Sequence, residues 1–222
     1  MPLFPLPQAL IFDCDSTLST IEGIDELAAA KNCRVEIAAL TDRAMNGEVP
    51  LEAVYAKRLE IIRPSRSDVR AIADLYAANP CLHAQEIVRH LQDKGVRVGI
   101  VSGGLLDAVL PFGQSLGIAE EDIFAVALDY DVQGNYRGVP PSPLTTAAGK
   151  FEIVAQWKAR HQFKSLYLVG DGMSDVAALG KAAADVVIGY GGVIARPAVR
   201  EQASIFIEQA DLLALLALWE DA

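Results

Sequence analysis

The stretch "ALIFDCDST", residues 9–17, decides the fold. An apolar run ends in two aspartates, Asp13 and Asp15, that are separated by one cysteine. A short run that is apolar throughout is typical of a strand in a parallel sheet, because both faces of such a sheet are covered. Two carboxylates placed directly after the strand repel each other unless a positive charge lies close to them. The stretch therefore predicts a buried parallel strand that ends at a cation-binding site.

Further apolar runs of the same kind lie over residues 96–102, 165–171 and 185–189. Helical patterns separate them, over residues 84–94, 105–116, 150–161 and 174–183. Strands that alternate with helices predict βαβ units, and hence an α/β fold with a doubly wound parallel sheet. We also expect a strand and hairpin over 124–138 and a last edge strand over 204–208. The apolar residues 212–219 are expected to form a buried terminal helix or a subunit contact.

The segment from residue 20 to residue 79 differs from the rest, because it holds helical patterns and no convincing strand. The patterns cover residues 24–32, 35–45, 51–62 and 66–78, with turn residues between them. We therefore expect an all-helical cap domain that is inserted after the first strand. The predicted boundaries are 19–81 for the cap and 1–18 together with 82–222 for the α/β core.

Composition limits the possible partners. The chain has 222 residues, 52% of them hydrophobic, and a formal net charge of -10, which argues against nucleic acid or an anionic membrane as a partner. A small phosphorylated substrate stays possible, because a local cluster of cations can override the global charge. The apolar runs are shorter than the roughly 18 residues that a membrane span needs, so we expect no membrane contact. Three cysteines without disulfide or zinc spacing, and a proline-broken start, favour a reducing cytoplasm.

Polar groups follow the predicted strands at the edge where ligands bind in open α/β sheets. These groups lie at residues 13–15, 102–104, 149–150 and 170–175. Carboxylates clustered there call for a hard cation with oxygen ligands, which indicates Mg²⁺. A lysine, a hydroxyl group and a glycine-flanked helix start beside Mg²⁺ suit a phosphate group. One carboxylate can attack phosphorus and a second can exchange a proton with the leaving alcohol, which predicts phosphoryl transfer through an aspartyl-phosphate.

The motifs D-x-D-S-T, S-G-G, G-K and G-D-G-x-x-D occur in this order, and with them the chain resembles the haloacid-dehalogenase superfamily of phosphohydrolases. Longer segments, "DCDSTLSTIEGIDELA" at 13–28 and further stretches at 41–69 and 189–216, resemble the phosphoserine phosphatase family within it. The resemblance covers nearly the whole chain.

The resemblance implies a Mg²⁺-dependent hydrolysis with Asp13 as the nucleophile and Asp15 as the acid and base. Ser102 and Lys150 are implied to bind and stabilise the phosphate. The other implied positions are Gly103 and Gly104 for the phosphate, and Asp13, Asp15 through its backbone carbonyl, Asp171 and Asp175 for the metal.

The resemblance also implies a substrate, O-phospho-L-serine, and with it a place in serine biosynthesis. Glu22 would receive the ammonium group, Arg58 the carboxylate, and Met45 would form an apolar wall. Leu51 stands where the family usually has Phe, which keeps open a related phosphatase or phosphotransferase for another phosphoamino acid or a sugar phosphate. The chain is expected to act as a monomer or a homodimer.

Simpler explanations exist for some of these residues. A glutamate near a helix start, such as Glu22, also interacts favourably with the helix dipole. Most helix arginines are surface groups, and Ser102 could simply cap a helix. A catalytically silent binding module is a third possible function, but it usually requires a lost nucleophile or lysine, and this sequence retains both.

Overall fold

The computed structural model describes residues 3–45 and 51–219, together with the side chains of all these residues except 41–45 and 51. In this part of the chain a six-stranded sheet has the order β3-β2-β1-β6-β7-β8, and all its strand pairs are parallel. Its strands are β1 (Ala9–Phe12), β2 (Arg97–Leu105), β3 (Ile123–Val126), β6 (Leu166–Gly170), β7 (Val186–Tyr190) and β8 (Ile205–Ile207).

The central strand β1 lies between β2 and β6, and all of its residues are buried. Along the sequence, β2 and β3 are added on one side of β1, and β6, β7 and β8 are then added on the other side. The order thus reverses next to β1, which is the point where open α/β sheets form a ligand crevice. Phe12, the last residue of β1, is in register with Ile100 of β2 and Val169 of β6, so the residues just beyond these three positions lie side by side at one edge of the sheet.

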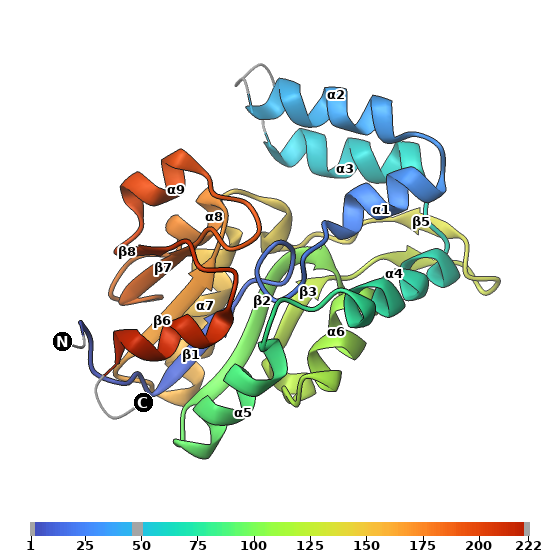
Figure 1. The fold of residues 1–222 in the computed structure, drawn as a ribbon. Coiled ribbons are helices and arrows are strands. Elements are labelled where there is room, and N and C mark those ends of the chain that lie inside the picture. Colours follow the sequence, from blue (N-terminus) through green and yellow to red (C-terminus); the bar gives the residue numbers. More distant parts are fainter. Residues whose placement is uncertain (1–2, 46–50, 220–222) are drawn as a thin grey trace.

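Apart from the helix predicted over 174–183, the helices lie between the strands as predicted (Figure 1). Figure 1 shows α1, α2 and α3 gathered beyond the carboxyl edge of the sheet, with α4 beside α6. The predicted fold class, a parallel α/β core with an inserted all-helical cap, is confirmed. The helices are α1 (Gly23–Ala30), α2 (Arg34–Met45), α3 (Leu51–Ile62), α4 (Arg66–Ala78), α5 (Ala84–Asp93), α6 (Leu106–Ser115), α7 (Gly149–His161), α8 (Met173–Val176) and α9 (Pro197–Gln202), with 3-10 helices η1 (Glu120–Asp122), η2 (Pro143–Thr145) and η3 (Leu212–Leu218).

The predicted hairpin is the antiparallel pair β4 (Asp129–Tyr130) and β5 (Tyr136–Gly138). It contacts the helical insert at the α3–α4 corner. The guanidinium of Arg63 lies 5.7 Å from the ring centre of Tyr136, and that of Arg66 lies 4.9 Å from the ring centre of Tyr130. The backbone N–H of Arg66 also donates to the carbonyl of Gly134 at 2.9 Å. The hairpin therefore fixes one corner of the insert to the core.

The chain leaves the core for the helical insert and returns to the core through two adjacent segments. Ser19 and Pro80 form an isolated antiparallel bridge. The N–H of Thr20 donates to the carbonyl of Asn79 at 2.9 Å, and the hydroxyl of Ser19 donates to the same carbonyl at 3.0 Å. The two connections are thus hydrogen-bonded to each other.

One predicted helix is wrong. The pattern at 174–183 gives only the short α8, which ends at Val176. Beyond it the chain turns back, because Leu179 and Ala184 form a bridge and the N–H of Gly180 donates to the carbonyl of Ala184 at 2.8 Å.

The last apolar segment forms the 3-10 helix η3, in which the leucines at every third position, Leu212, Leu215 and Leu218, are buried. This agrees with the prediction of a buried terminal helix. Among the described residues, none of the helices combines the length and the apolar character that a membrane crossing requires.

Candidate active site

Lys150 is buried between two carboxylates at the carboxyl edge of the sheet. Its Nζ lies 2.7 Å from Oδ2 of Asp13 and 2.7 Å from Oδ1 of Asp175. The lysine is in the first turn of α7, which begins at Gly149. Burial alone would lower the pKa of Lys150, but the charges of Asp13 and Asp175 raise it above its ordinary value. The ammonium group therefore stays charged and offsets part of the local negative charge.

The short helix α8, which follows β6, carries Asp175 into this cluster. Its Oδ2 accepts from the backbone N–H of Gly172 at 3.0 Å, while its Oδ1 accepts from Lys150. A Cβ atom on Gly170 would collide with the carboxylate of Asp175. Glycine at 170 is therefore required for this close approach, which explains the first glycine of the G-D-G-x-x-D motif.

Three buried carboxylates form a possible metal site. Asp13, Asp171 and Asp175 each offer an oxygen, and these oxygens all lie within 4.8 Å of one another. Burial raises the pKa of Asp171 to about 6, and the nearby charge of Asp13 adds to this effect. The donor set consists of oxygens alone, which fits a hard divalent cation such as Mg²⁺. Such an ion would offset the repulsion among the three carboxylates.

The two oxygens of Asp15 have different surroundings. Oδ1 accepts from the hydroxyl of Tyr76 at 2.7 Å and from the N–H of Gly23 at 2.8 Å. Oδ2 lies beside the end of β2, since a Cβ on Gly104 would be 3.1 Å from it. Burial raises the pKa of Asp15 to about 6, although the hydrogen bond from Tyr76 lowers it. The carboxyl group is thus held by one oxygen while the other faces Gly104.

Glu22 precedes α1 but makes no side-chain cap of that helix. Its Oε1 accepts from the hydroxyl of Ser16 at 2.7 Å and lies 3.8 Å from a guanidinium nitrogen of Arg196. Burial raises the pKa of Glu22 to about 7, with a further contribution from the charge of Asp15. The carboxylate lines the same cavity as Asp13 and Asp15.

Arg58, on α3, also lines this cavity. Its guanidinium lies 5.8 Å from the ring centre of Tyr55, and burial lowers its pKa. Its Nε is buried and has no hydrogen-bond partner among the described residues. An unpaired buried N–H carries a desolvation penalty, so a ligand that supplies an acceptor here would be favoured.

Ser102 is buried within β2, and its Oγ accepts from the N–H of Gly104 at 2.9 Å. Among the described residues the hydroxyl of Ser102 donates no side-chain hydrogen bond, so its hydrogen can be donated to a ligand. The hydroxyls of Thr145 and Thr146 also border the cavity, but they donate to carbonyls of their own turn at 2.8 and 2.9 Å.

The predicted residues thus surround one cavity of about 580 Å³, between the insert and the carboxyl edge of the sheet. Ser102 and Asp175 are directly behind its wall, in contact with Gly104 and Lys150. The predicted positions Met45 and Leu51 have side chains outside the described part of the structure. The predicted residues that line the cavity are Asp13, Asp15, Glu22, Arg58, Gly103, Gly104, Lys150 and Asp171.

A family model for haloacid dehalogenase-like hydrolases matches residues 7–183. The chain belongs to this family. The hydrolase is 35% identical to phosphoserine phosphatase of Bos taurus over 222 residues, which covers 99% of this chain and 96% of the relative. A solved phospho-aspartyl intermediate analogue of phosphoserine phosphatase superposes with a TM-score of 0.82 at 28% identity, covering 96% and 99% of the two chains. DsGPDH of Dunaliella salina gives a TM-score of 0.82 at 26% identity, but this chain spans only 36% of it.

Three residues of the hydrolase site were not predicted from the sequence, namely Tyr55, Tyr76 and Arg196. Arg196 donates from Nε to Oδ2 of Asp171 at 3.0 Å and follows β7. The carboxyl end of β7 is at the same edge of the sheet as the carboxyl ends of β1 and β6. The place of Arg196 shortly after β7 in the sequence could therefore have indicated that it lies near the site. The tyrosines contact Gly103 and Asp15 over 48 and 61 residues of sequence, and helical periodicity does not reveal such contacts.

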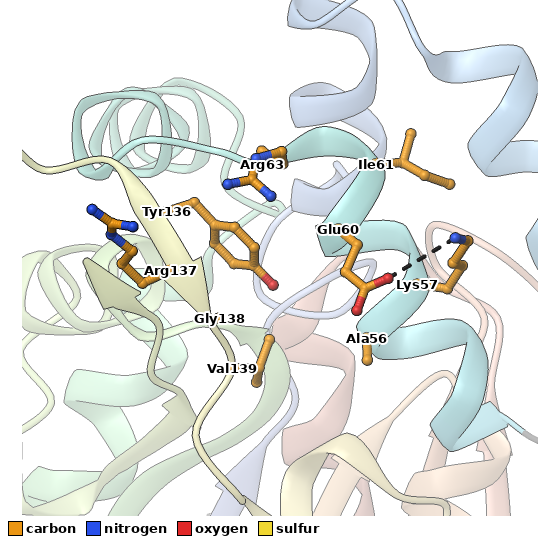
Figure 2. A pocket seen from close by; sticks show the side chains of 9 residues that line it. All are labelled: Ala56, Lys57, Glu60, Ile61, Arg63, Tyr136, Arg137, Gly138 and Val139. Carbon is orange, nitrogen blue, oxygen red and sulfur yellow. Dashed lines mark ion pairs between the residues drawn. The ribbon is translucent and has the colours of Figure 1, made fainter. Parts of the chain in front are cut away.

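A second cavity, of about 530 Å³, lies between α3 and β5 (Figure 2). Figure 2 shows Lys57 paired with Glu60, a contact of 3.9 Å, and Arg63 beside the ring of Tyr136. Arg137 on the opposite wall pairs with an aspartate of the hairpin at 3.3 Å. Because two of its three cations already have carboxylate partners, this cavity is a weaker candidate for an anionic ligand than the first.

Proposed function

We propose that this hydrolase cleaves O-phospho-L-serine to L-serine and inorganic phosphate. The observation that carries the proposal is that Arg58, whose buried Nε has no hydrogen-bond partner among the described residues, lines the same cavity as Glu22 and the Asp13–Asp15 pair. A ligand with a carboxylate would pair with Arg58, its ammonium group would pair with Glu22, and its phosphate would lie beside Asp13 with Lys150 as the nearby cation. The similarity to phosphoserine phosphatases over nearly the full chain supports this substrate.

In the proposed complex, Arg58 binds the substrate carboxylate and Glu22 its ammonium group. Ser102 donates its hydroxyl hydrogen to a phosphate oxygen. The Gly103–Gly104 segment follows Ser102 and borders the same phosphate. Lys150 offsets the negative charge of the phosphoryl oxygens. Arg196 lies between Glu22 and Asp171 and limits the repulsion that two nearby carboxylates exert on each other and on the substrate.

Asp13 is the proposed nucleophile. Its carboxylate attacks phosphorus, the bond between phosphorus and the serine oxygen breaks, and an aspartyl-phosphate forms. Asp15 gives the proton from Oδ2 to the departing serine oxygen, since Oδ1 is held by Tyr76 and Gly23. Bound Mg²⁺, held by Asp13, Asp171, Asp175 and the backbone carbonyl of Asp15, would supply charge neutralisation and Lewis acidity.

Hydrolysis of the aspartyl-phosphate completes the cycle. Asp15, now ionised, takes a proton at Oδ2 from a water molecule whose oxygen attacks phosphorus. The bond between phosphorus and Asp13 breaks, which restores the Asp13 carboxylate and releases phosphate. A pKa of about 6 suits a group that must act as an acid and then as a base near neutral pH.

The helical insert, residues 19–81, is proposed to act as a cap over residues 1–18 and 82–222. Opening would admit substrate, and closure would exclude water from the aspartyl-phosphate. A cytoplasmic location, and a monomer or homodimer as the active form, stay predictions from the sequence.

A substrate panel with and without Mg²⁺ tests the function. We expect kcat/KM for phosphoserine to exceed that for phosphoethanolamine, which lacks the carboxylate, and for phosphoglycerate, which lacks the ammonium group. Each missing group should cost about tenfold or more, because it leaves Arg58 or Glu22 unpaired. Higher kcat/KM for a sugar phosphate than for phosphoserine would favour the alternative that Leu51 keeps open. Background activity across the whole panel would favour the silent binding module.

A further inference from the structure

Tyr55 joins the helical insert to the backbone of the core. It is on α3, and its hydroxyl donates to the carbonyl of Gly103 at 2.8 Å. Burial raises the pKa of Tyr55 well above its usual value, so the phenol stays protonated and acts as a donor. A second contact between insert and core lies close by, where Oε1 of Glu52 accepts from the N–H of Ala147 at 3.3 Å.

The carbonyl of Gly103 and the N–H of Gly104 belong to the same peptide unit. In a trans peptide these two groups point in opposite directions. Here the carbonyl accepts from Tyr55, and the N–H donates to Oγ of Ser102 at 2.9 Å. The peptide unit is therefore held at both ends, once by the insert and once by the hydroxyl that is proposed to bind phosphate.

This peptide unit lies near the end of β2, where the register with β3 shifts between Val101 and Leu105. It is flanked by two glycines, which allow a wider range of backbone conformations than other residues. A Cβ on Gly103 would have a single neighbour, the carbonyl oxygen of Leu144 at 3.8 Å, so the space around this residue is open. Without the Tyr55 hydroxyl, the carbonyl of Gly103 loses the donor that fixes it, and the peptide can turn so that its N–H moves away from Ser102, although Val109 and Asp15 lie close to Gly104.

We propose that Tyr55 is a positioning residue that couples closure of the helical insert to the orientation of the Ser102 hydroxyl. When the insert is closed, Tyr55 fixes the Gly103–Gly104 peptide. That peptide in turn donates to Oγ of Ser102 and directs the Ser102 hydrogen toward the phosphate. Nothing in this coupling requires a direct contact between Tyr55 and the substrate.

The first test measures amide hydrogen exchange of Gly104 by NMR in the intact protein without substrate. In Tyr55→Phe the ring and its contact with Arg58 are kept and the hydroxyl is lost, so we expect exchange of the Gly104 amide to accelerate about tenfold. Tyr167→Phe is the matched control, since it removes a tyrosine donor to a backbone carbonyl, that of Pro5, far from the site. Equal Gly104 exchange in wild type and Tyr55→Phe would overturn the proposal.

The second test is a double-mutant cycle with inorganic phosphate as the probe, measured by calorimetry in the presence of Mg²⁺. Tyr55→Phe should raise the Kd for phosphate about fivefold, which corresponds to the free energy that one ordinary hydrogen bond contributes. In the Ser102→Ala background the same substitution should have no further effect, because the hydroxyl that it orients is absent. An equal loss in both backgrounds would show that Tyr55 acts independently of Ser102 and would contradict the coupling.

This inference rests on the proposed function only for the second test. If wild type failed to hydrolyse phosphoserine, the proposed function would fail. The exchange result for Gly104 would still decide whether the relay, the hydrogen bonds from Tyr55 through the Gly103–Gly104 peptide to Ser102, operates. If the exchange of Gly104 were unchanged in Tyr55→Phe while wild type hydrolysed phosphoserine, the relay would fail and the function would stand.

Discussion

Nζ of Lys150 lies 2.7 Å from Oδ2 of Asp13, the first aspartate after the central strand. Both side chains are buried, so the pair gives up hydration that its own attraction only partly restores. A buried ion pair of this kind is weak evidence for stability, and its position at the edge of the sheet favours a chemical role. In the proposed mechanism, the charge of Lys150 offsets the negative charge of the phosphoryl oxygens.

Asp13→Asn should abolish phosphoserine turnover, with a loss of at least about a thousandfold in kcat, because the amide is a poor nucleophile toward phosphorus. Lys150 keeps Asp175 as a partner, so the fold should persist. Phosphate release and thermal unfolding measure the two effects. The matched control Asp129→Asn, at an exposed position in the hairpin, should leave both unchanged. Full activity of Asp13→Asn would exclude the proposed mechanism.

Mg²⁺ should raise the melting temperature of the wild-type protein, since a ligand that binds only the folded state stabilises it. At a hundred times Kd the gain is about 2.7 kcal/mol, which corresponds to roughly 5–10 °C for a chain of this size. Asp171→Asn removes one of the three clustered carboxylates and should largely abolish the shift, whereas Asp129→Asn should keep it. A full Mg²⁺-dependent shift in Asp171→Asn would argue against the proposed metal site. Chelation of Mg²⁺ should also reduce activity to background.

Arg58→Lys should lower kcat/KM for phosphoserine by about 10- to 100-fold, because a lysine cannot reproduce charge-assisted contacts from a planar guanidinium. The same variant should hydrolyse phosphoethanolamine about as well as wild type does, since that ester has no carboxylate. Arg63→Lys, one residue beyond the end of α3, is the control and should affect neither substrate. A parallel loss on both esters would indicate a general structural role for Arg58.

A pH effect on stability is expected far from the active site, at His83 and Asp211. Nδ1 of His83 lies 2.8 Å from Oδ1 of Asp211, and this contact raises the pKa of His83. A raised pKa means that the stabilisation is fully present below the ordinary histidine pKa and is lost as pH rises through the raised value.

The melting temperature of wild type should therefore exceed that of His83→Asn at pH 6 by more than it does at pH 9. Asparagine suits this position because His83 has a left-handed backbone, with φ of 60°. The effect should be small, because the pair is partly exposed. The double variant with Asp211→Asn should show no additional pH dependence. A constant difference across this pH range would contradict the assignment of the pair.

Much of the fold was predictable because each element of the sheet carries its own local pattern. The apolar runs predicted the main strands, and the turn residues between helical patterns gave α3 and α4 their bounds. Site residues in short motifs, such as Asp13 and Lys150, were predictable because strand ends converge on one edge. Their roles stay predictions until variants are tested.

The features that were not predicted depend on packing between distant segments. α8 ends early because the chain turns back to pair Leu179 with Ala184, and its alanine-rich sequence gives no indication of that turn. Tyr76 reaches Asp15 from another helix, and Arg196 reaches Asp171 from a loop. In each case the side chain is ordinary in its local context, and only the tertiary structure determines its partner.

The hydrogen-bonded connections at Ser19–Thr20 and Asn79–Pro80 affect how the inserted segment of such an enzyme can change during evolution. Because the chain leaves the core and returns at neighbouring points, the length of the segment between them places little strain on the sheet. A segment of different size could replace residues 20–79 while β1 and the aspartates after it keep their positions. Substrate choice could then diverge by exchange of this module, while the chemistry that acts on the phosphoryl group stays the same.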